Sequence, residues 1–285
     1  MQALLLCALV AGCQPRVRIR SRIPADPCAG ALRPGTGSRG ARAAPLRSGG
    51  TPNPDSLDRA IARLIAYVDT IDDAPSLQML LQYAHRRFGV SEFADARARY
   101  DRATKMPAER VFRRIVDRES VAAPADLARL GDTDVMVSAA LYCDVLPLPP
   151  DYRATLDARR ESGGYDLTHV LLSLELLREN SCTGVVPPGY EDSVATDVAA
   201  LVAASGPPTD LEIESEALLC IVGCGHLLHP GFTQRLVGAQ RADGGFSASG
   251  QALMPSRWHA SGLALVVLLD SRYPTAPLIP LIGTK

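Results

Sequence analysis

The sequence has few aromatic residues. It contains one tryptophan among 285 residues, and Phe, Trp and Tyr together make up 5% of the chain. Proteins that bind single-stranded nucleic acid commonly stack the bases on aromatic side chains, so this scarcity argues against that function. The chain also lacks an overall excess of charge, because 30 Lys and Arg residues face 31 Asp and Glu residues. We therefore expect no nucleic-acid partner.

Familiar enzyme motifs are missing too. The sequence has no phosphate-binding P-loop, no G-x-S-x-G nucleophile turn and no H-E-x-x-H zinc motif. The residues by themselves therefore name no reaction. Apolar residues make up 47% of the chain, which is enough to build a substantial core.

The near-zero net charge hides two oppositely charged parts. Residues 14–50 hold eight arginines and one acidic residue, a local charge of +7, whereas residues 51–285 hold 22 basic and 30 acidic residues, a charge of −8. Residues 14–54 are rich in Gly and Pro and show no apolar periodicity, so we interpret them as a disordered basic tether. The tether would attract anionic lipid by about 1 kcal/mol per arginine near the surface. The alternative is a solvated spacer.

Residues 1–13 form an apolar stretch that ends in Cys13. The stretch is shorter than the roughly 20 residues of a membrane-spanning helix but long enough for a secretory signal peptide. Val10-Ala11-Gly12-Cys13 resembles the lipobox of bacterial lipoproteins, in which the cysteine is lipidated, although the usual preceding basic residues are absent. We predict lipidation at Cys13 and an exported protein anchored to a membrane of the cell envelope. The alternatives are a secreted protein and a cytoplasmic one.

The sequence from residue 55 onward has a helical pattern. Leu57, Ile61 and Leu64 follow intervals of three and four, and Asp55 or Ser56 is available as a helix cap. Strand-like alternation is scarce, so residues 55–285 are predicted to form one all-α domain. Further helices are expected near residues 77–88, 92–103, 108–118, 133–145, 166–179, 190–204, 210–228 and 257–271.

Two glycine pairs mark an internal repeat. Gly163-Gly164-Tyr165 and Gly244-Gly245-Phe246 lie 81 residues apart, which leaves room for two helical hairpins. A histidine follows each pair, His169 after the first and His259 after the second. We expect each pair to form a turn before an inward-facing helix, with the histidine near the start of that helix.

The second repeat carries a resemblance to a known family. Gln240-Arg241-Ala242-Asp243-Gly244-Gly245-Phe246, followed by His259, resembles a repeat of the α/α-toroid superfamily of terpene cyclases and protein prenyltransferases. The likeness covers residues 236–270 and, more weakly, 159–177. It implies helical hairpins that form a complete or incomplete toroid around a central cavity. Such a fold does not fix an activity.

The catalytic residues of that superfamily are not recognisable in this chain. His259 falls where the prenyltransferases have a zinc-binding histidine, but their Asp-x-Cys partner is missing, and Tyr142-Cys143-Asp144 has a different order. The acidic D-x-D-D cluster of the squalene-type cyclases has no counterpart. Five Phe and one Trp are also few for a cavity that stabilises carbocations by cation–π contacts. We expect neither cyclisation nor prenyl transfer.

The two repeat histidines form a candidate site. In a toroid, His169 and His259 would occupy corresponding positions of inner helices, near one mouth of the cavity. Asp166 lies three residues before His169, so it would share the helix face and fix the tautomer of the ring. These three residues are therefore the candidate catalytic set, as a general base or as metal ligands. The alternative is that each histidine only packs against its own turn.

A second candidate site is a cluster of zinc-competent residues. Cys220, Cys224, His226 and His229 lie within ten residues of each other. A straight helix turns by about 100° per residue, so all four side chains converge on one zinc ion only if the helix breaks. The alternative is that the two cysteines are small buried residues.

Cysteine usage leads to one further expectation. Five cysteines remain after Cys13 and the segment before it are set aside. In an exported protein, one disulfide is expected among the last four, and their spacing does not identify the pair. These four are Cys143, Cys182, Cys220 and Cys224.

These observations predict an exported, lipid-anchored helical protein that binds a ligand or partner in its cavity or on its rim. The expected partners are the membrane, through the anchor and the tether, and an unidentified ligand or protein. Two alternatives stay open. One is a metal-assisted hydrolase or lyase that uses His169 and His259, with zinc as the candidate cofactor. The other is a structural protein of the cell envelope.

Overall fold

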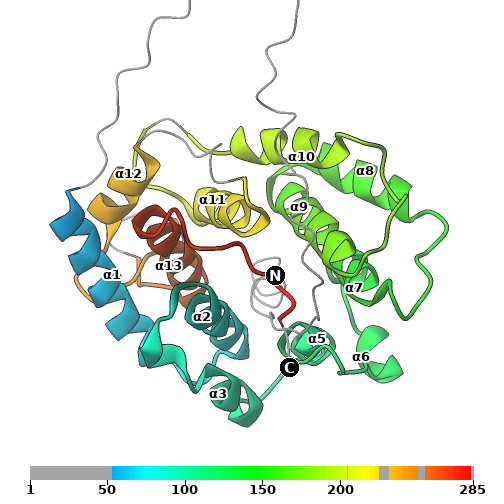
Figure 1. Cartoon of the computed structure of the whole chain (residues 1–285), viewed down its shortest axis with the longest axis horizontal. Coiled ribbons are helices and arrows are strands. Elements are labelled where there is room, and N and C mark those ends of the chain that lie inside the picture. Colours follow the sequence, from blue (N-terminus) through cyan, green and yellow to red (C-terminus); the bar gives the residue numbers. More distant parts are fainter. Residues whose placement is uncertain (1–52, 204, 225–230, 250–253, 284–285) are drawn as a thin grey trace, which may run out of the picture.

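Helix follows helix along the described chain (Figure 1). The structure is a computed structural model and describes residues 53–203, 205–224, 231–249 and 254–283, among which no strand occurs. The predicted all-α class is therefore confirmed. The predicted signal peptide and lipobox at 1–13, and all but the last two residues of the predicted tether, lie outside the described residues.

The helices differ widely in length, and none of those described is both long and apolar enough to cross a bilayer. Their bounds are α1 Pro54–Asp69, α2 Pro75–Phe88, the 3-10 turn η3 Ser91–Phe93, α3 Ala96–Arg102, α4 Pro107–Val111, α5 Arg113–Val116, α6 Pro124–Leu127, α7 Asp132–Tyr142, α8 Tyr152–Ser162, α9 Gly164–Glu179, α10 Tyr190–Ala199, α11 Asp210–Val222, α12 Phe232–Ala239 and α13 Trp258–Arg272.

Helix α1 begins slightly before the predicted start. Asn53 is the cap, and its side-chain oxygen accepts a hydrogen bond from the backbone N–H of Asp55 at 3.0 Å. Pro54 occupies the first turn, where its missing N–H costs nothing. The expected caps, Asp55 and Ser56, lie inside the helix.

Three helices were not predicted from the sequence, namely α6, α8 and α12. Helix α8 buries only Tyr152 and Leu156, so its apolar stripe is too sparse to signal a helix. Helices α6 and α12 are short, with four and eight residues. Helix α11 also ends earlier than expected, at Val222.

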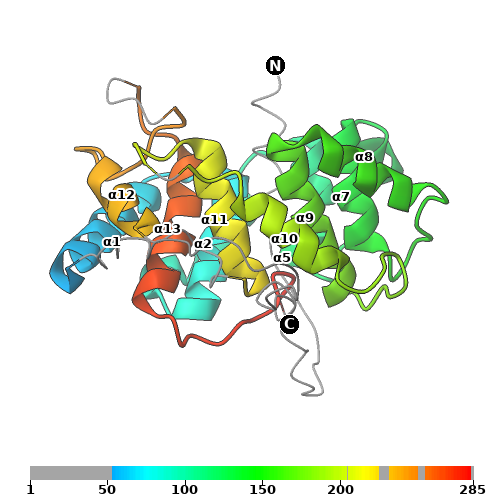
Figure 2. The ribbon, with the colours of Figure 1, turned by 90° about the horizontal axis from the view of Figure 1, so that it is seen from above.

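The helices α2, α7, α9, α11 and α13 form an inner row. Helix α9 packs against α7 and α11, α11 packs against α13, and α13 packs against α2. Helices α8 and α10 pack against α9 from outside, and α1 packs against α13 (Figures 1 and 2). Almost every residue of α9, α11 and α13 beyond the first turn is buried, because neighbours surround these helices.

Contacts at the two ends of the inner row fix the direction of its helices. At one end, Tyr165 of α9 donates to Asp210 of α11 at 3.1 Å, and Asp210 contacts His259 of α13 at 2.9 Å. These residues lie at the beginnings of their helices. At the other end, Arg87 near the end of α2 donates to the carbonyl of Cys220 near the end of α11 at 2.9 Å. The N-terminal ends of α9, α11 and α13 therefore meet on one side of the molecule.

The turn of the second repeat joins the beginning of the domain to its last hairpin. Gln240 donates from Nε2 to the carbonyls of Ala60 in α1, at 2.8 Å, and of Gly244, at 2.9 Å. Gly244 has φ of +93°, and a Cβ there would lie 2.4 Å from the carbonyl oxygen of Arg63. Only glycine fits this left-handed position against α1.

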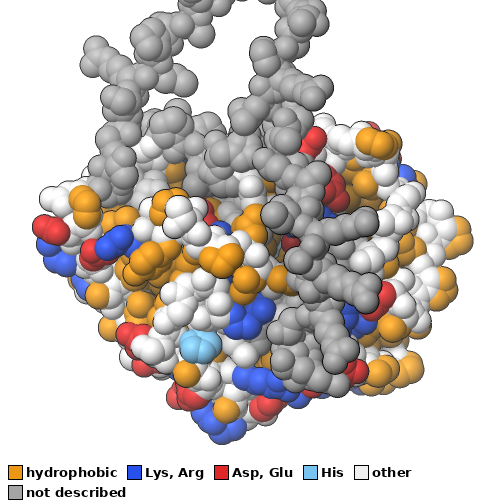
Figure 3. Space-filling model, viewed as in Figure 1, with side chains coloured by type: hydrophobic (Ala, Val, Ile, Leu, Met, Phe, Trp, Pro, Cys, Tyr) orange, Lys and Arg blue, Asp and Glu red, His pale blue; other side chains and the backbone are white. Residues whose placement is uncertain are grey.

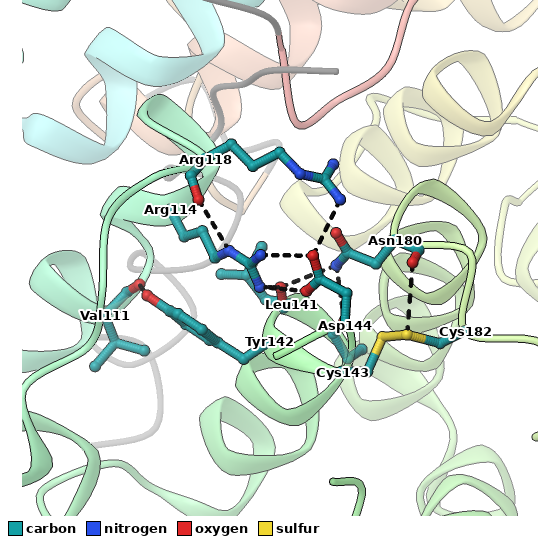
Figure 4. Close-up of polar contacts among 10 residues, drawn as sticks. Val111, Arg114, Arg118, Leu141, Tyr142, Cys143, Asp144, Asn180 and Cys182 are labelled. Carbon is teal, nitrogen blue, oxygen red and sulfur yellow. Dashed lines mark hydrogen bonds and ion pairs between the residues drawn. A yellow bond between two sulfur atoms is a disulfide. The ribbon is translucent and has the colours of Figure 1, made fainter. Parts of the chain in front are cut away.

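A disulfide between Cys143 and Cys182 links the segments that follow α7 and α9 (Figure 4). The expectation of one disulfide among the last four cysteines is thereby confirmed. Beside it, Arg114 of α5 pairs with Asp144 through two hydrogen bonds of 2.6 and 2.7 Å, and Arg118 adds a third at 3.1 Å. Together, these contacts hold α5, α7 and α9 at one end of the inner row.

Candidate functional site

The structure brings His169 and His259 to the same buried carboxylate, that of Glu214. Nδ1 of His169 lies 3.8 Å from Oε1 of Glu214, and Nε2 of His259 lies 3.5 Å from Oε2. The exposed fractions are 1% for His169, 4% for His259 and 0% for Glu214. We call these three residues the His–Glu–His cluster. Three inner helices, α9, α11 and α13, each contribute one member.

The three residues meet because their helices are parallel. His169 and Glu214 lie in the second turns of α9 and α11, and His259 is the second residue of α13. The N-terminal end of a helix carries a partial positive charge, which favours carboxylates placed there. Asp210, the first residue of α11, lies in this favourable field.

Both histidine rings are oriented by a second contact. Nδ1 of His259 lies 2.9 and 3.0 Å from the two carboxylate oxygens of Asp210. Nδ1 of His169 lies 2.5 Å from the carbonyl of Tyr165, one helical turn earlier. Because a carbonyl only accepts hydrogen bonds, Nδ1 of His169 carries the proton, and Nε2 is left with a lone pair when the ring is neutral.

Burial and neighbouring charges shift the pKa values of the three residues of the cluster. Burial raises the pKa of Glu214 to about 7 and lowers the pKa of His169 to about 4. Burial also acts to lower the pKa of His259, but the hydrogen bond and charge of Asp210, with the charge of Glu214, outweigh it and raise the pKa. At neutral pH, His169 is therefore neutral and Glu214 is near the midpoint of its titration.

Three polar atoms of the cluster make no hydrogen bond within the described part of the chain. They are Nε2 of His169, Nε2 of His259 and Oε2 of Glu214. A buried polar atom without a partner costs about 1–3 kcal/mol, so most such atoms in proteins are satisfied by protein, water or ligand. The cluster thus has both donor and acceptor capacity that its own neighbours leave unused.

Asp166 does not take the predicted role. Its carboxylate accepts hydrogen bonds from Thr133 at 3.0 Å and from Arg159 at 3.1 Å. The ring of His169 is held instead by the backbone of Tyr165. The two side chains diverge because Asp166 turns toward α7 and α8, whereas His169 turns toward α11.

The predicted zinc cluster receives no support from its two described members. Cys224 is disulfide-bonded and so offers no thiolate. Cys220 is a free, buried thiol, and burial raises its pKa well above the usual value. His226 and His229 lie outside the described residues. Across the described ranges, no group of three or more His, Cys, Asp or Glu side chains is arranged to hold a metal ion.

Two hollows lie away from the His–Glu–His cluster. The first, between α9, α10 and α11, has a volume of about 10 Å³, which is about the space of one water molecule. The second is a surface groove of about 410 Å³ along α1. The small hollow is lined by Leu171, Leu174, Glu175, Glu191, Ala195, Val222 and Cys224. The groove is lined by Asp58, Ile61, Ala62, Ile65, Ala66, Asp69, Glu92 and Tyr273.

Sequence reasoning missed Asp210 and Glu214, which complete the site. One signal was present, because Thr209 and Glu212 form a capping box that marks the start of α11. Glu214 then falls next to Ile213, on a helix that is apolar on most sides. An acidic residue in such a setting points to a buried partner.

No family model, curated protein or solved structure matches this chain.

Proposed function

We propose that this protein is an exported, lipid-anchored, toroid-like helical protein that binds a small polar ligand at the His–Glu–His cluster. The observation that carries the proposal is the set of three unsatisfied buried atoms, Nε2 of His169, Nε2 of His259 and Oε2 of Glu214. They belong to side chains from three helices that meet at one carboxylate, with Nδ1 of His169 at 3.8 Å and Nε2 of His259 at 3.5 Å from the oxygens of Glu214.

The chemistry of these atoms defines the ligand class. The lone pair on Nε2 of His169 and the oxygen of Glu214 accept hydrogen bonds. A ligand that satisfies both carries at least two N–H or O–H donors. The tight burial of the cluster restricts it to a small group, so we propose an amine or a hydroxyl compound.

The lipid anchor and the export are proposed from the sequence, with Cys13 as the lipidated residue. The disulfide between Cys143 and Cys182 supports export, since such bonds persist mainly in oxidising compartments. The basic tether would face anionic lipid and the acidic helical domain would be held away from it. Mass spectrometry of the native protein tests this directly: a diacylglyceryl group on Cys13 is expected, and an intact Met1 would exclude it.

Ligand binding is tested by NMR of the histidine rings in ¹⁵N-labelled protein. Methylamine and ethylene glycol serve as probes of the two ligand classes. We expect at least one of them to shift the Nε2 signals of His169 and His259 while leaving His85 unchanged. His85 lies in the last turn of α2, at the other end of the inner row, and its Nδ1 is 2.8 Å from the carbonyl oxygen of Val90. Glu214→Gln should weaken the effect. Equal shifts at all three rings, or none, would reject the proposal.

A second candidate is a hydrolase or lyase that uses the same cluster. The observation in its favour is the pairing of Asp210 with His259 beside Glu214, whose pKa of about 7 suits a general acid or base at neutral pH. Zinc in a stoichiometric amount by elemental analysis of the native protein would favour the metal-assisted form. A structural envelope role is what remains if neither binding nor turnover depends on the cluster.

A further inference from the structure

The chain that follows α13 crosses the opposite end of the inner row. We call residues 273–283 the C-terminal strap. It runs from the end of α13 over the middle of the molecule toward α5 (Figure 1), on the side where the inner helices end (Figure 2). In the space-filling view from the same side, hydrophobic side chains gather over α1, α13 and the beginning of the strap (Figure 3).

The strap is held through its backbone. Nη2 of Arg86, near the end of α2, donates to the carbonyls of Pro280 at 2.9 Å and Leu281 at 3.1 Å. The carboxylate of Glu179, the last residue of α9, accepts from the backbone N–H of Leu281 and, at 2.7 Å, from that of Ile282. The side chains of Arg86 and Glu179 thus bind neighbouring carbonyl and amide groups of an extended segment.

Two apolar side chains anchor the strap. Leu281 is 1% exposed and Ile282 is fully buried. Leu278 lies against Gly223 at the end of α11, where a Cβ would come within 2.5 Å of it. Residues 273–275, 277 and 278 are exposed, so the segment that joins the buried Leu281 and Ile282 to α13 is open to solvent.

These contacts have the form of peptide recognition. Main-chain hydrogen bonds supply affinity for an extended peptide, and pockets for selected side chains supply specificity. The described strap contains no helix that would hold it in place by itself. The strap is held by contacts with the ends of α2, α9 and α11, and a separate peptide would be held in the same way.

We propose that the ends of α2, α9 and α11 form a binding site for an extended apolar peptide, and that the C-terminal strap is its resident and displaceable occupant. The sequence of the strap indicates the ligand class. The ligand is a peptide segment with two adjacent aliphatic residues after a proline, as in Pro280, Leu281 and Ile282. The site lies at the other end of the inner row from the His–Glu–His cluster, so it does not depend on the function proposed there.

The hydrogen bonds of Glu179 favour exchange of one peptide for another over an empty site. Burial and the nearby Glu175 raise the pKa of Glu179. Removing the strap takes away the two N–H donors from which the half-buried Glu179 accepts, and an acceptor that loses its partners in such a setting is costly. A competing peptide restores both bonds, whereas solvent restores them only if the site opens widely.

The experiment uses the full chain with a protease recognition sequence inserted between Thr275 and Ala276, in the exposed part of the strap. After cleavage, the strap stays bound without a covalent link. A fluorescein-labelled peptide with the sequence of residues 277–282 is then added and its anisotropy is measured. We expect binding to the cleaved protein to be at least about tenfold tighter than to the intact one, because a tethered strap competes at a millimolar effective concentration.

Two controls separate recognition from folding. A peptide with aspartate in place of Leu281 should not bind, and this control leaves the protein unchanged. Glu179→Gln should weaken binding by about tenfold, whereas Glu191→Gln, which does not contact the strap, should not. Equal binding to cleaved and intact protein, absence of binding to the cleaved protein, or equal binding of the aspartate peptide would overturn the proposal.

Discussion

Nε2 of His259 lies 3.5 Å from Oε2 of Glu214, and both side chains are buried between parallel inner helices. The histidine comes from α13 and the carboxylate from α11, and Asp210 holds the other nitrogen of the ring at 2.9 Å. Two carboxylates therefore flank one imidazole in a region from which water is largely excluded. The pKa of His259 therefore reports on both of these contacts.

Replacing Asp210 by asparagine is expected to lower the pKa of His259. In the native protein this pKa is raised above 6.5, so its contribution to stability is complete below pH 6.5 and is lost as pH rises through the native value. Asp210→Asn should therefore cost more at pH 6 than at pH 9, by about 1–3 kcal/mol. NMR titration and urea denaturation check both parts. Asp132→Asn is the control, since Asp132 also begins a helix but is exposed.

Replacing Glu214 by glutamine should remove the stability loss that accompanies ionisation of this buried side chain. Burial raises the pKa of Glu214 from 4.5 to about 7, so the native state holds this proton more tightly and loses stability as pH rises from 4.5 to 7. Relative to the native protein, Glu214→Gln should gain about 3 kcal/mol across this range. Urea denaturation at several pH values measures it. The same gain in the exposed Glu161→Gln variant would count against the explanation.

The variant His169→Gln should show the opposite trend. Burial lowers the pKa of His169 from 6.5 to about 4, so the unfolded chain takes up a proton that the native state refuses. The native protein therefore gains stability from this residue as pH rises from 4 to 6.5. The free energy of unfolding of His169→Gln, relative to that of the native protein, should be about 3 kcal/mol higher at pH 4.5 than at pH 7. A difference that does not vary with pH would show that the ring is not buried in its neutral form.

A methyl group at Gly244 should be strongly destabilising. The Cβ of Gly244→Ala would lie 2.4 Å from the carbonyl oxygen of Arg63, and φ of +93° is unfavourable for alanine. We expect a loss of about 2–4 kcal/mol in thermal or urea unfolding. Gly238→Ala is the matched control, because nothing lies near its Cβ and alanine favours the helix α12. Equal effects of the two changes would show that the turn does not pack against α1.

Loss of the disulfide between Cys143 and Cys182 should lower stability by about 4 kcal/mol, from the chain entropy of the loop it closes. The double variant with serine at both positions tests this in urea. A non-reducing peptide map should link Cys143 to Cys182 and leave Cys220 as a free thiol. A map that pairs either residue with Cys220 would contradict the structure.

Much of the helical pattern was predictable from local periodicity. The expected helices near residues 133–145, 166–179 and 257–271 match α7, α9 and α13 closely, because they are long, mostly apolar segments without strand-like alternation. Helices α8 and α12 were missed because they bury only two residues each and so carry little apolar signal. Partial contact with an inner helix, rather than their own pattern, stabilises them.

The candidate site was predictable only in part. The repeat placed His169 and His259 at equivalent positions, but Asp166 turned away to Thr133 and Arg159, and Glu214 was not foreseen. A spacing of three residues says which side chains can share a face of one helix. It does not say which face meets a neighbouring helix.

The sequence by itself determined the all-α class, the two glycine turns and the histidines that follow them, since these depend on local backbone preferences and periodicity. Only the tertiary structure decided that Glu214 lies between His169 and His259, that Cys143 pairs with Cys182, and that the strap rests on Glu179 and Arg86. These contacts join residues between 39 and 195 positions apart. They depend on how whole helices pack, and no local pattern encodes that packing.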